Sequence, residues 1–363
     1  MQADSSAIAK PASMRIRTAG LDFKRRNPLP GLALTLAIAA MSIAAGSLPS
    51  LRANGISSLT LAIVSGMVVG NTFYGRVAAR CEAGVHFSRQ YLLRLGIVLY
   101  GFRLTFQDIA HVGAAGILID ALMLLSTFGL ALLLGEKLFG LERDTAALIG
   151  AGSSICGAAA VMATAPVLRA RSEQVAIAVS TVVAFGTIAI FLYPCLYRWH
   201  LSGLLPASPS AFGIYIGSTV HEVAQVLAAG RAIDPGIADT AVIVKMVRVM
   251  MLAPFLILLS AAFRTGRADG KHAAKLAIPW FAFVFIAVTC FNSLGWLQSS
   301  TLHHIGDADT LLLSMAMAGL GLSTHIGAVR RAGLRPLLLA ALLFVWLVCG
   351  GAAINRAIAT LFA

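Results

Sequence analysis

Residues 113–135 read Gly113-Ala-Ala-Gly-Ile-Leu-Ile-Asp-Ala-Leu-Met-Leu-Leu-Ser-Thr-Phe-Gly-Leu-Ala-Leu-Leu-Leu-Gly135, and this stretch carries one charged residue, Asp120. A transmembrane helix needs about 20 consecutive, mostly apolar residues to cross the hydrocarbon core of a bilayer. The stretch has that length in one uninterrupted run. It therefore predicts a membrane-spanning helix.

The composition of the whole chain is that of a polytopic membrane protein. Hydrophobic residues make up 58% of the 363 residues and charged residues 12%, whereas soluble domains carry about 25% charged residues. So few charges could not cover a soluble surface, which excludes soluble, secreted, disordered and fibrous classes. The net charge of +13 comes mostly from Lys and Arg between the apolar runs. That placement is typical of cytoplasmic loops and argues against a nucleic-acid partner.

Eleven apolar segments follow one another with short connections. They cover residues 31–49, 58–74, 88–102, 113–135, 145–168, 174–197, 212–230, 237–262, 277–297, 309–326 and 335–358. No linker is long enough to separate two domains. We therefore expect an all-α polytopic membrane protein with about 10–11 transmembrane segments. A basic cytoplasmic arm (1–30) would precede a single transmembrane transporter domain (31–363).

Positive charges predict the orientation in the inner (plasma) membrane, because Lys- and Arg-rich loops stay in the cytoplasm. The Lys- and Arg-bearing segments are the N-terminal arm and residues 75–88, 263–276 and 327–335. This places the N-terminus in the cytoplasm. A full crossing by 145–168 would leave Arg169 and Arg171 outside, against the rule. If 145–168 instead dips in and returns, both stay inside, and a second re-entrant segment at 212–230 restores the count.

An internal repeat supports the re-entrant alternative. Residues 152–163, Gly-Ser-Ser-Ile-Cys-Gly-Ala-Ala-Ala-Val-Met-Ala, align with residues 217–228, Gly-Ser-Thr-Val-His-Glu-Val-Ala-Gln-Val-Leu-Ala, and five of twelve positions are identical. Short apolar stretches also match by chance. Paired Gly-interrupted segments are nevertheless a sequence indication of a transporter's binding site.

The first candidate site residues are Gly152, Ser153, Ser154 and Gly157. The glycines allow the helix to unwind or to approach another helix closely, and the serines stand where they could cap the following helix. The free N–H groups at such a helix start attract anions. Packing of small residues between helices is the alternative interpretation.

A second group, Thr219, His221, Glu222 and Gln225, places ionisable and amide side chains inside an apolar segment. Ionisable residues within the membrane are functional candidates because their insertion is costly. We expect Thr219 and Gln225 at a substrate site. We expect His221 and Glu222 to take part in proton coupling, since histidine titrates near neutral pH. A structural ion pair of Glu222 is the alternative.

Lys245 and Arg248 lie three residues apart on one helical face within another apolar run. Arg offers a planar fork for oxyanions and Lys a point charge, so both are predicted to bind a substrate anion. Snorkelling of Lys245 to the interface is the alternative. Arg94 and Arg103 are interpreted as interface or structural residues, and the role of Asp120 is left open.

Nothing in the sequence predicts an enzyme, a metal site or a cofactor. Gly152-x-Ser154 is not completed to G-x-S-x-G, because residue 156 is Cys. The five cysteines are scattered and form no C-x-x-C pair. No P-loop motif for nucleotide binding occurs.

Five motifs together resemble the YeiH-like family of bacterial inner-membrane proteins, to which sulfate export is attributed. They are Leu95-Gly-Ile-Val-Leu-Tyr-Gly-Phe-Arg103, Gly152-Ser-Ser-Ile-Cys-Gly157, Thr219-Val-His-Glu-Val-Ala-Gln-Val226, Val244-Lys-Met-Val-Arg-Val249 and Ala318-Gly-Leu-Gly-Leu-Ser-Thr324. The resemblance implies a fold similar to cation/proton antiporters and bile-acid-type symporters, with two inverted five-helix repeats. It also implies broken helices at 145–168 and 309–326, an assignment we prefer here to the pairing of 145–168 with 212–230.

The leading functional hypothesis is a secondary transporter for a small anion, sulfate or an organosulfonate, linked to protons. The alternatives are a cation/proton antiporter that uses Glu222 and His221, and a membrane scaffold that transports nothing. The expected partners are the lipid bilayer, the anion and protons. Whether copies of the chain form a homo-oligomer is left open.

Overall fold

The computed structural model describes residues 27–48, 57–199, 208–264, 280–324 and 332–361, and within these ranges every regular element is helical. Six of the described helices are long and apolar enough to cross a bilayer. They are Leu29–Gly46, Val112–Lys137, Glu173–Arg198, Pro235–Ala262, Ser299–Ser323 and Leu334–Leu361. The prediction of an all-α polytopic membrane protein is confirmed. Most of the predicted arm, 1–30, lies outside the described residues.

The elements differ from the predicted segments mainly in where they are interrupted. In chain order they are α2 (Leu29–Gly46), α4 (Ser58–Thr72), α5 (Tyr74–Phe87), η1 (Ser88–Leu92), α6 (Leu93–Tyr100), η2 (Gly101–Arg103), α7 (Phe106–Lys137), α8 (Arg143–Ser154), α9 (Ala158–Leu168), α10 (Ser172–Arg198), α11 (Pro209–Thr219), α12 (Val223–Arg231), α13 (Pro235–Met250), α14 (Leu252–Arg264), α15 (Trp280–Asn292), α16 (Ser299–Ser323), α18 (Leu334–Val345), η3 (Trp346–Gly350) and α19 (Gly351–Leu361).

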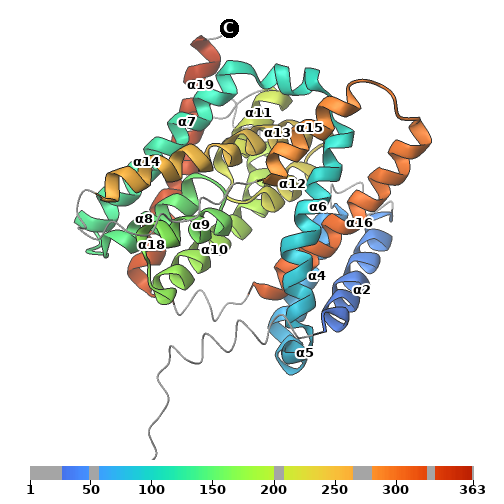
Figure 1. The fold of residues 1–363 in the computed structure, drawn as a ribbon, viewed down its shortest axis with the longest axis horizontal. Helices are drawn as coiled ribbons and strands as arrows, with labels where there is room; N and C mark the ends of the chain where they lie inside the picture. Colours follow the sequence, from blue (N-terminus) through green and yellow to red (C-terminus); the bar gives the residue numbers. More distant parts are fainter. Residues whose placement is uncertain (1–26, 49–56, 200–207, 265–279, 325–331, 362–363) are drawn as a thin grey trace, which may run out of the picture.

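The helices form two groups, which lie side by side in Figure 1. The first group contains α2, α4, α5, α6, α15 and α16, and the second contains α7 to α14 with α18 and α19. Within the first group, α4 and α16 pack backbone against backbone: a Cβ at Gly66 would lie 2.5 Å from the carbonyl oxygen of Ala318. Few helix pairs connect the groups, among them α12 with α4 and α13 with α15.

Helices α8 and α9 form a re-entrant hairpin, because the residues before α8 and after α9 meet. Arg171 Nη2 pairs with Glu142 Oε1 at 2.7 Å, and Gln174 Nε2 donates to Glu142 Oε2 at 2.7 Å. Near the tip of the hairpin, a Cβ at Gly152 would lie 2.7 Å from Val161 Cγ2 on α9. Both ends of the segment are therefore on one side, which places Arg171 beside Glu142 and resolves the charge conflict.

Helices α11 and α12 form a second re-entrant hairpin, whose two ends both contact the start of α13. A Cβ at Gly213 on α11 would lie 2.7 Å from Thr240 Cβ, and one at Gly230 on α12 would lie 2.6 Å from Ala238 Cα. The ring of Tyr197, at the C-terminal end of α10, packs 4.9 Å from Phe212 near the start of α11. Since α10 begins at the base of the first hairpin, the two hairpins enter from opposite ends of α10.

The second interruption therefore lies at 212–230 and not at 309–326. The expected broken helix at 309–326 is wrong: residues 299–323 form the continuous helix α16. Its glycines, Gly319 and Gly321, serve close packing instead, since a Cβ at Gly321 would lie 2.8 Å from the Met67 backbone nitrogen. The pairing that the sequence repeat indicated is the correct one. The two inverted five-helix repeats stay a prediction.

Candidate functional site

The tip of the first hairpin is a three-residue break between α8 and α9. Helix α8 ends at Ser154, Ile155 has non-helical φ −122° and ψ −84°, and Gly157 has φ +70° and ψ −136°. A positive φ is readily available only to glycine, so Gly157 enables the chain to turn into α9. The idea that Ser153 or Ser154 caps α9 is wrong, because both belong to the last turn of α8 and Gly157 is the residue before α9.

The tip of the second hairpin is also a three-residue break, between α11 and α12. Helix α11 ends at Thr219, and both Val220 and Glu222 have extended backbone angles before α12 begins. The Gln225 side chain closes the first turn of α12, because its Oε1 accepts from the Glu222 backbone N–H at 3.0 Å.

The two tips touch through the Glu222 carboxylate. Its Oε1 accepts a hydrogen bond of 3.0 Å from the backbone N–H of Ala158, the first residue of α9. The unpaired N–H groups at a helix start carry a partial positive charge. Glu222 therefore places a carboxylate on the positive end of α9, and Gly157 leaves room for it.

Lys245 on α13 joins one carbonyl from each hairpin. Its Nζ donates to the Ile155 carbonyl at 2.7 Å and to the Val220 carbonyl at 2.6 Å. Ile155 and Val220 occupy equivalent positions in the sequence repeat. The repeat therefore aligns two residues whose carbonyls bind the same side chain, Lys245. The side chain is fully buried, so it does not snorkel to an interface.

Arg248, one helical turn along α13, makes a second bridge of the same kind. Its Nε donates to the Ser154 carbonyl at 2.7 Å, and its Nη1 donates to the Ser218 carbonyl. The last carbonyls of a helix carry the negative end of its dipole and lack partners inside the helix. Lys245 and Arg248 therefore neutralise the C-terminal ends of α8 and α11 together. Nη2 of Arg248 has no hydrogen-bond partner in the described residues.

Asp120 on α7 supplies a negative charge to this centre. It is fully buried, neither carboxylate oxygen has a partner in the described part of the chain, and its charge interacts with those of Arg248 and Lys245. An unpaired ion is costly away from water. The opposite charges of Asp120 and the two cations reduce that cost for one another.

The remaining predicted residues lie around the tips with different surroundings. Thr219 Oγ1 accepts from the Tyr193 hydroxyl at 2.7 Å. His221 is 1% exposed, its ring lies 6.1 Å from that of Phe344 on α18, and its Nδ1 has no partner in the described residues. Glu222, by contrast, is partly exposed. The direct contacts of all these residues with a substrate stay predictions.

Arg89 is a charged residue near the tips that sequence reasoning missed. It lies in η1 of the first helix group, its Nη1 donates to Ser323 Oγ of α16 at 3.0 Å, and its charge interacts with that of Glu222. The first helix group therefore places a positive charge close enough to the second hairpin tip to interact with the Glu222 carboxylate. In the sequence, Arg89 could have been noticed as a charged residue inside the predicted apolar segment 88–102.

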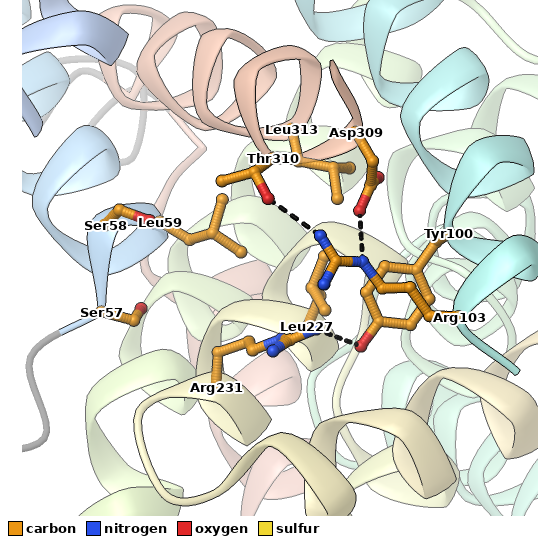
Figure 2. Close-up of a pocket in the computed structure, with 10 residues that line it drawn as sticks. All are labelled: Ser57, Ser58, Leu59, Tyr100, Arg103, Leu227, Arg231, Asp309, Thr310 and Leu313. Atoms are coloured by element: carbon orange, nitrogen blue, oxygen red, sulfur yellow. Dashed lines mark hydrogen bonds and ion pairs between the residues drawn. The ribbon is translucent and has the colours of Figure 1, made fainter. Parts of the chain in front are cut away.

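A small cavity lined by both polar and apolar residues lies on the boundary between the helix groups, near the end of α6. Figure 2 shows its lining residues from α4, α6, η2, α12 and α16. The cavity encloses about 90 Å³, room for a few water molecules or a small ion. Arg103 Nε pairs with Asp309 Oδ2 at 2.9 Å, within the first group.

The Tyr100 hydroxyl at this cavity joins the two helix groups. It donates to Asp239 Oδ1 at 2.5 Å and accepts from Arg231 Nη2 at 3.0 Å. Asp239 belongs to α13 and Arg231 to α12, whereas Tyr100 belongs to α6. This end of the boundary is therefore held by polar contacts between the groups.

Comparisons with known proteins give a family and no activity. A model of the family described as conserved hypothetical protein 698 matches residues 30–340. The UPF0324 membrane protein PA5383 of Pseudomonas aeruginosa is 63% identical over 332 residues, which cover 90% of this chain and 94% of that protein. The UPF0324 inner membrane protein YeiH of Escherichia coli K12 is 55% identical over 340 residues, which cover 92% and 95%.

Proposed function

The chain belongs to the family of conserved hypothetical protein 698, that of the YeiH inner membrane proteins, and for this multi-pass inner-membrane member we propose secondary transport of a small anion. The observation that carries the proposal is the pair of interrupted helices whose tips meet at Glu222 and Ala158. In secondary transporters, discontinuous helices form the substrate site near the middle of the bilayer. No nucleotide-binding motif accompanies them in the sequence.

The position of the tips supports transport further. The charge of Glu222 interacts with that of Arg89 in the other helix group, and the cavity beside Tyr100 lies on the boundary between the groups. Movement of one helix group against the other would expose such a boundary site to one side of the membrane and then to the other. Alternating access of this kind is the general mechanism of secondary transporters.

The charges at the site favour an anion. Helices α9 and α12 both begin at the tips, and their free N–H groups attract negative charge. Arg89 adds a cation from the opposite side, and the buried Lys245 and Arg248 add two more behind the tips. Sulfate and organosulfonates are the oxyanions that we propose to test first.

The Glu222 carboxylate provides a physical link to protons. In the structure it accepts from the Ala158 N–H, a donor that a substrate anion at the start of α9 would also use. Two negative groups repel each other in a site of low dielectric. Protonation of Glu222 would remove its charge and release this position, so that the anion and the proton bind together.

The proposal is tested by uptake into proteoliposomes. A panel of radiolabelled sulfate and organosulfonates would be measured with and without a pH gradient, with empty liposomes as the control. We expect at least one anion to enter faster when a pH gradient is imposed. Equal uptake in protein-containing and empty liposomes across the panel would refute the proposal.

The buried Asp120 gives a specific reason to test the cation/proton antiporter as well, because buried carboxylates carry protons in such proteins. That function predicts proton flux that requires Na⁺ and is indifferent to the anion. Fluorescence of a pH-sensitive dye inside the same proteoliposomes separates the two functions. If the protein is a scaffold instead, neither flux appears.

A further inference from the structure

The main-chain carbonyls at the two hairpin tips are already bound to cations of the protein itself. In Na⁺-coupled secondary transporters, the unwound carbonyls and the C-terminal ends of half-helices coordinate the coupling ion. Here Ile155 and Val220, the corresponding carbonyls of the two hairpins, both accept from Lys245 Nζ at 2.7 and 2.6 Å. The ammonium group stands between the tips, where a free cation would bind.

We propose that Lys245 is a tethered substitute for a coupling cation, so that the wild-type protein requires no alkali ion and loss of this side chain creates an alkali-ion site. The role of Lys245 as a substitute for a coupling cation rests on the proposed transport function. The binding of an alkali ion in its place can be tested without measuring transport. Lys245 is fully buried and holds one carbonyl of each hairpin, so its charge is a fixed part of the tip.

The chemistry of the site fits an alkali ion once the lysine is gone. The two carbonyl oxygens have lone pairs directed to one point, and carbonyl oxygens can replace the hydration shell of a monovalent cation. Asp120 supplies a negative charge nearby, and it interacts with Lys245 in the wild type. Truncation to alanine would leave space for the ion together with the water that completes its coordination.

Three variants separate a cation effect from a packing effect. Lys245→Ala removes the charge and leaves space, whereas Lys245→Met removes the charge and fills the space. Met246→Ala is the matched control, because Met246 is the next residue on α13 and is also fully buried, but donates no hydrogen bond to the tips. All three remove a buried group and are expected to lower the melting temperature.

The experiment measures the melting temperature of the purified protein in detergent with NaCl, KCl or choline chloride at equal ionic strength. We expect Lys245→Ala to gain on the order of 3 °C in Na⁺ or K⁺ relative to choline at a tenfold excess over the dissociation constant. The wild type, Lys245→Met and Met246→Ala should show no difference between salts. Whether Na⁺ or K⁺ gives the larger shift identifies the ion that fits.

Two results with folded protein would overturn the inference, and a third concerns folding itself. One is a wild-type protein that Na⁺ or K⁺ stabilises specifically. The other is a folded Lys245→Ala protein that melts at the same temperature in all three salts. If Lys245→Ala does not fold in choline, its recovery during purification in Na⁺ or K⁺ supports the inference, and failure in all salts overturns it. Because the readout is stability, an absence of transport would refute the proposed function alone.

Discussion

Replacement of Gly157 by alanine tests the geometry of the hairpin tips most sharply. Gly157 has φ +70° and ψ −136°, and a Cβ there would lie 2.7 Å from Glu222 Oε1. A non-glycine residue in a sparsely populated backbone region costs about 1–3 kcal/mol. The Glu222 carboxylate would also have to leave the Ala158 N–H, and loss of a hydrogen bond to a charged group costs about 1.5–3 kcal/mol. We expect the free energy of unfolding to fall by about 2.5–6 kcal/mol.

The assay is reversible unfolding in mixed micelles, with two comparison variants. Gly129→Ala is the control, because Gly129 is helical and its added Cβ meets no atom within 4 Å, so the change should be neutral or stabilising. In a Glu222→Ala background, the cost of Gly157→Ala should shrink to the backbone strain alone. If Gly157→Ala is as harmless as Gly129→Ala, both the positive φ at Gly157 and the contact between the two tips are contradicted.

Three further predictions concern the membrane topology, the boundary between the two helix groups, and His221. In a background without native cysteines, a single cysteine at Arg169 should react with impermeant thiol reagents from the cytoplasm and one at Ser300 from the periplasm; reaction from the same side contradicts the re-entrant hairpin. Tyr100→Phe removes the hydroxyl that links the helix groups, so a cysteine at Leu227 should react faster, and an unchanged rate would show that this contact does not hold the groups together. The sequence made both His221 and Glu222 candidates for proton coupling, and His221→Gln separates them: if Glu222, which accepts from the Ala158 N–H, carries the proton alone, the pH dependence of anion affinity stays in place, and if the dependence disappears, His221 carries the proton.

The sequence predicted the membrane class, and it offered the hairpin pairing as the alternative to the assignment that we preferred; both depend on local patterns. Apolar runs near 20 residues and the positions of basic loops define the spans. The repeat of 152–163 with 217–228 identified both interrupted segments, and the conflict at Arg169 and Arg171 indicated re-entry. The resemblance to antiporters led to the wrong second interruption, because Gly319 and Gly321 look like helix breaks but serve close packing, Gly321 against α4 and Gly319 against the end of α5 and η1.

The contacts at the site could not be read from the sequence. Lys245 and Arg248 were recognised as intramembrane cations, but their partners are main-chain carbonyls, which leave no side-chain signature. The contact between Glu222 and Ala158 depends on how two hairpins from opposite sides meet. Arg89 reaches the site through packing between α16 and η1, which is a property of the tertiary structure.

Proton uptake on anion binding tests the central claim most directly. The binding of an anion from the uptake panel to the purified protein would be measured calorimetrically at one pH in buffers of different ionisation enthalpy, which gives the number of protons bound per anion. If Glu222 leaves the start of α9 by becoming protonated, the wild type should take up protons as the anion binds, and proton binding should raise anion affinity by the same linkage. Glu222→Gln should bind the anion without proton uptake. Equal proton uptake in the wild type and in Glu222→Gln would contradict the assignment of Glu222 as the coupling group.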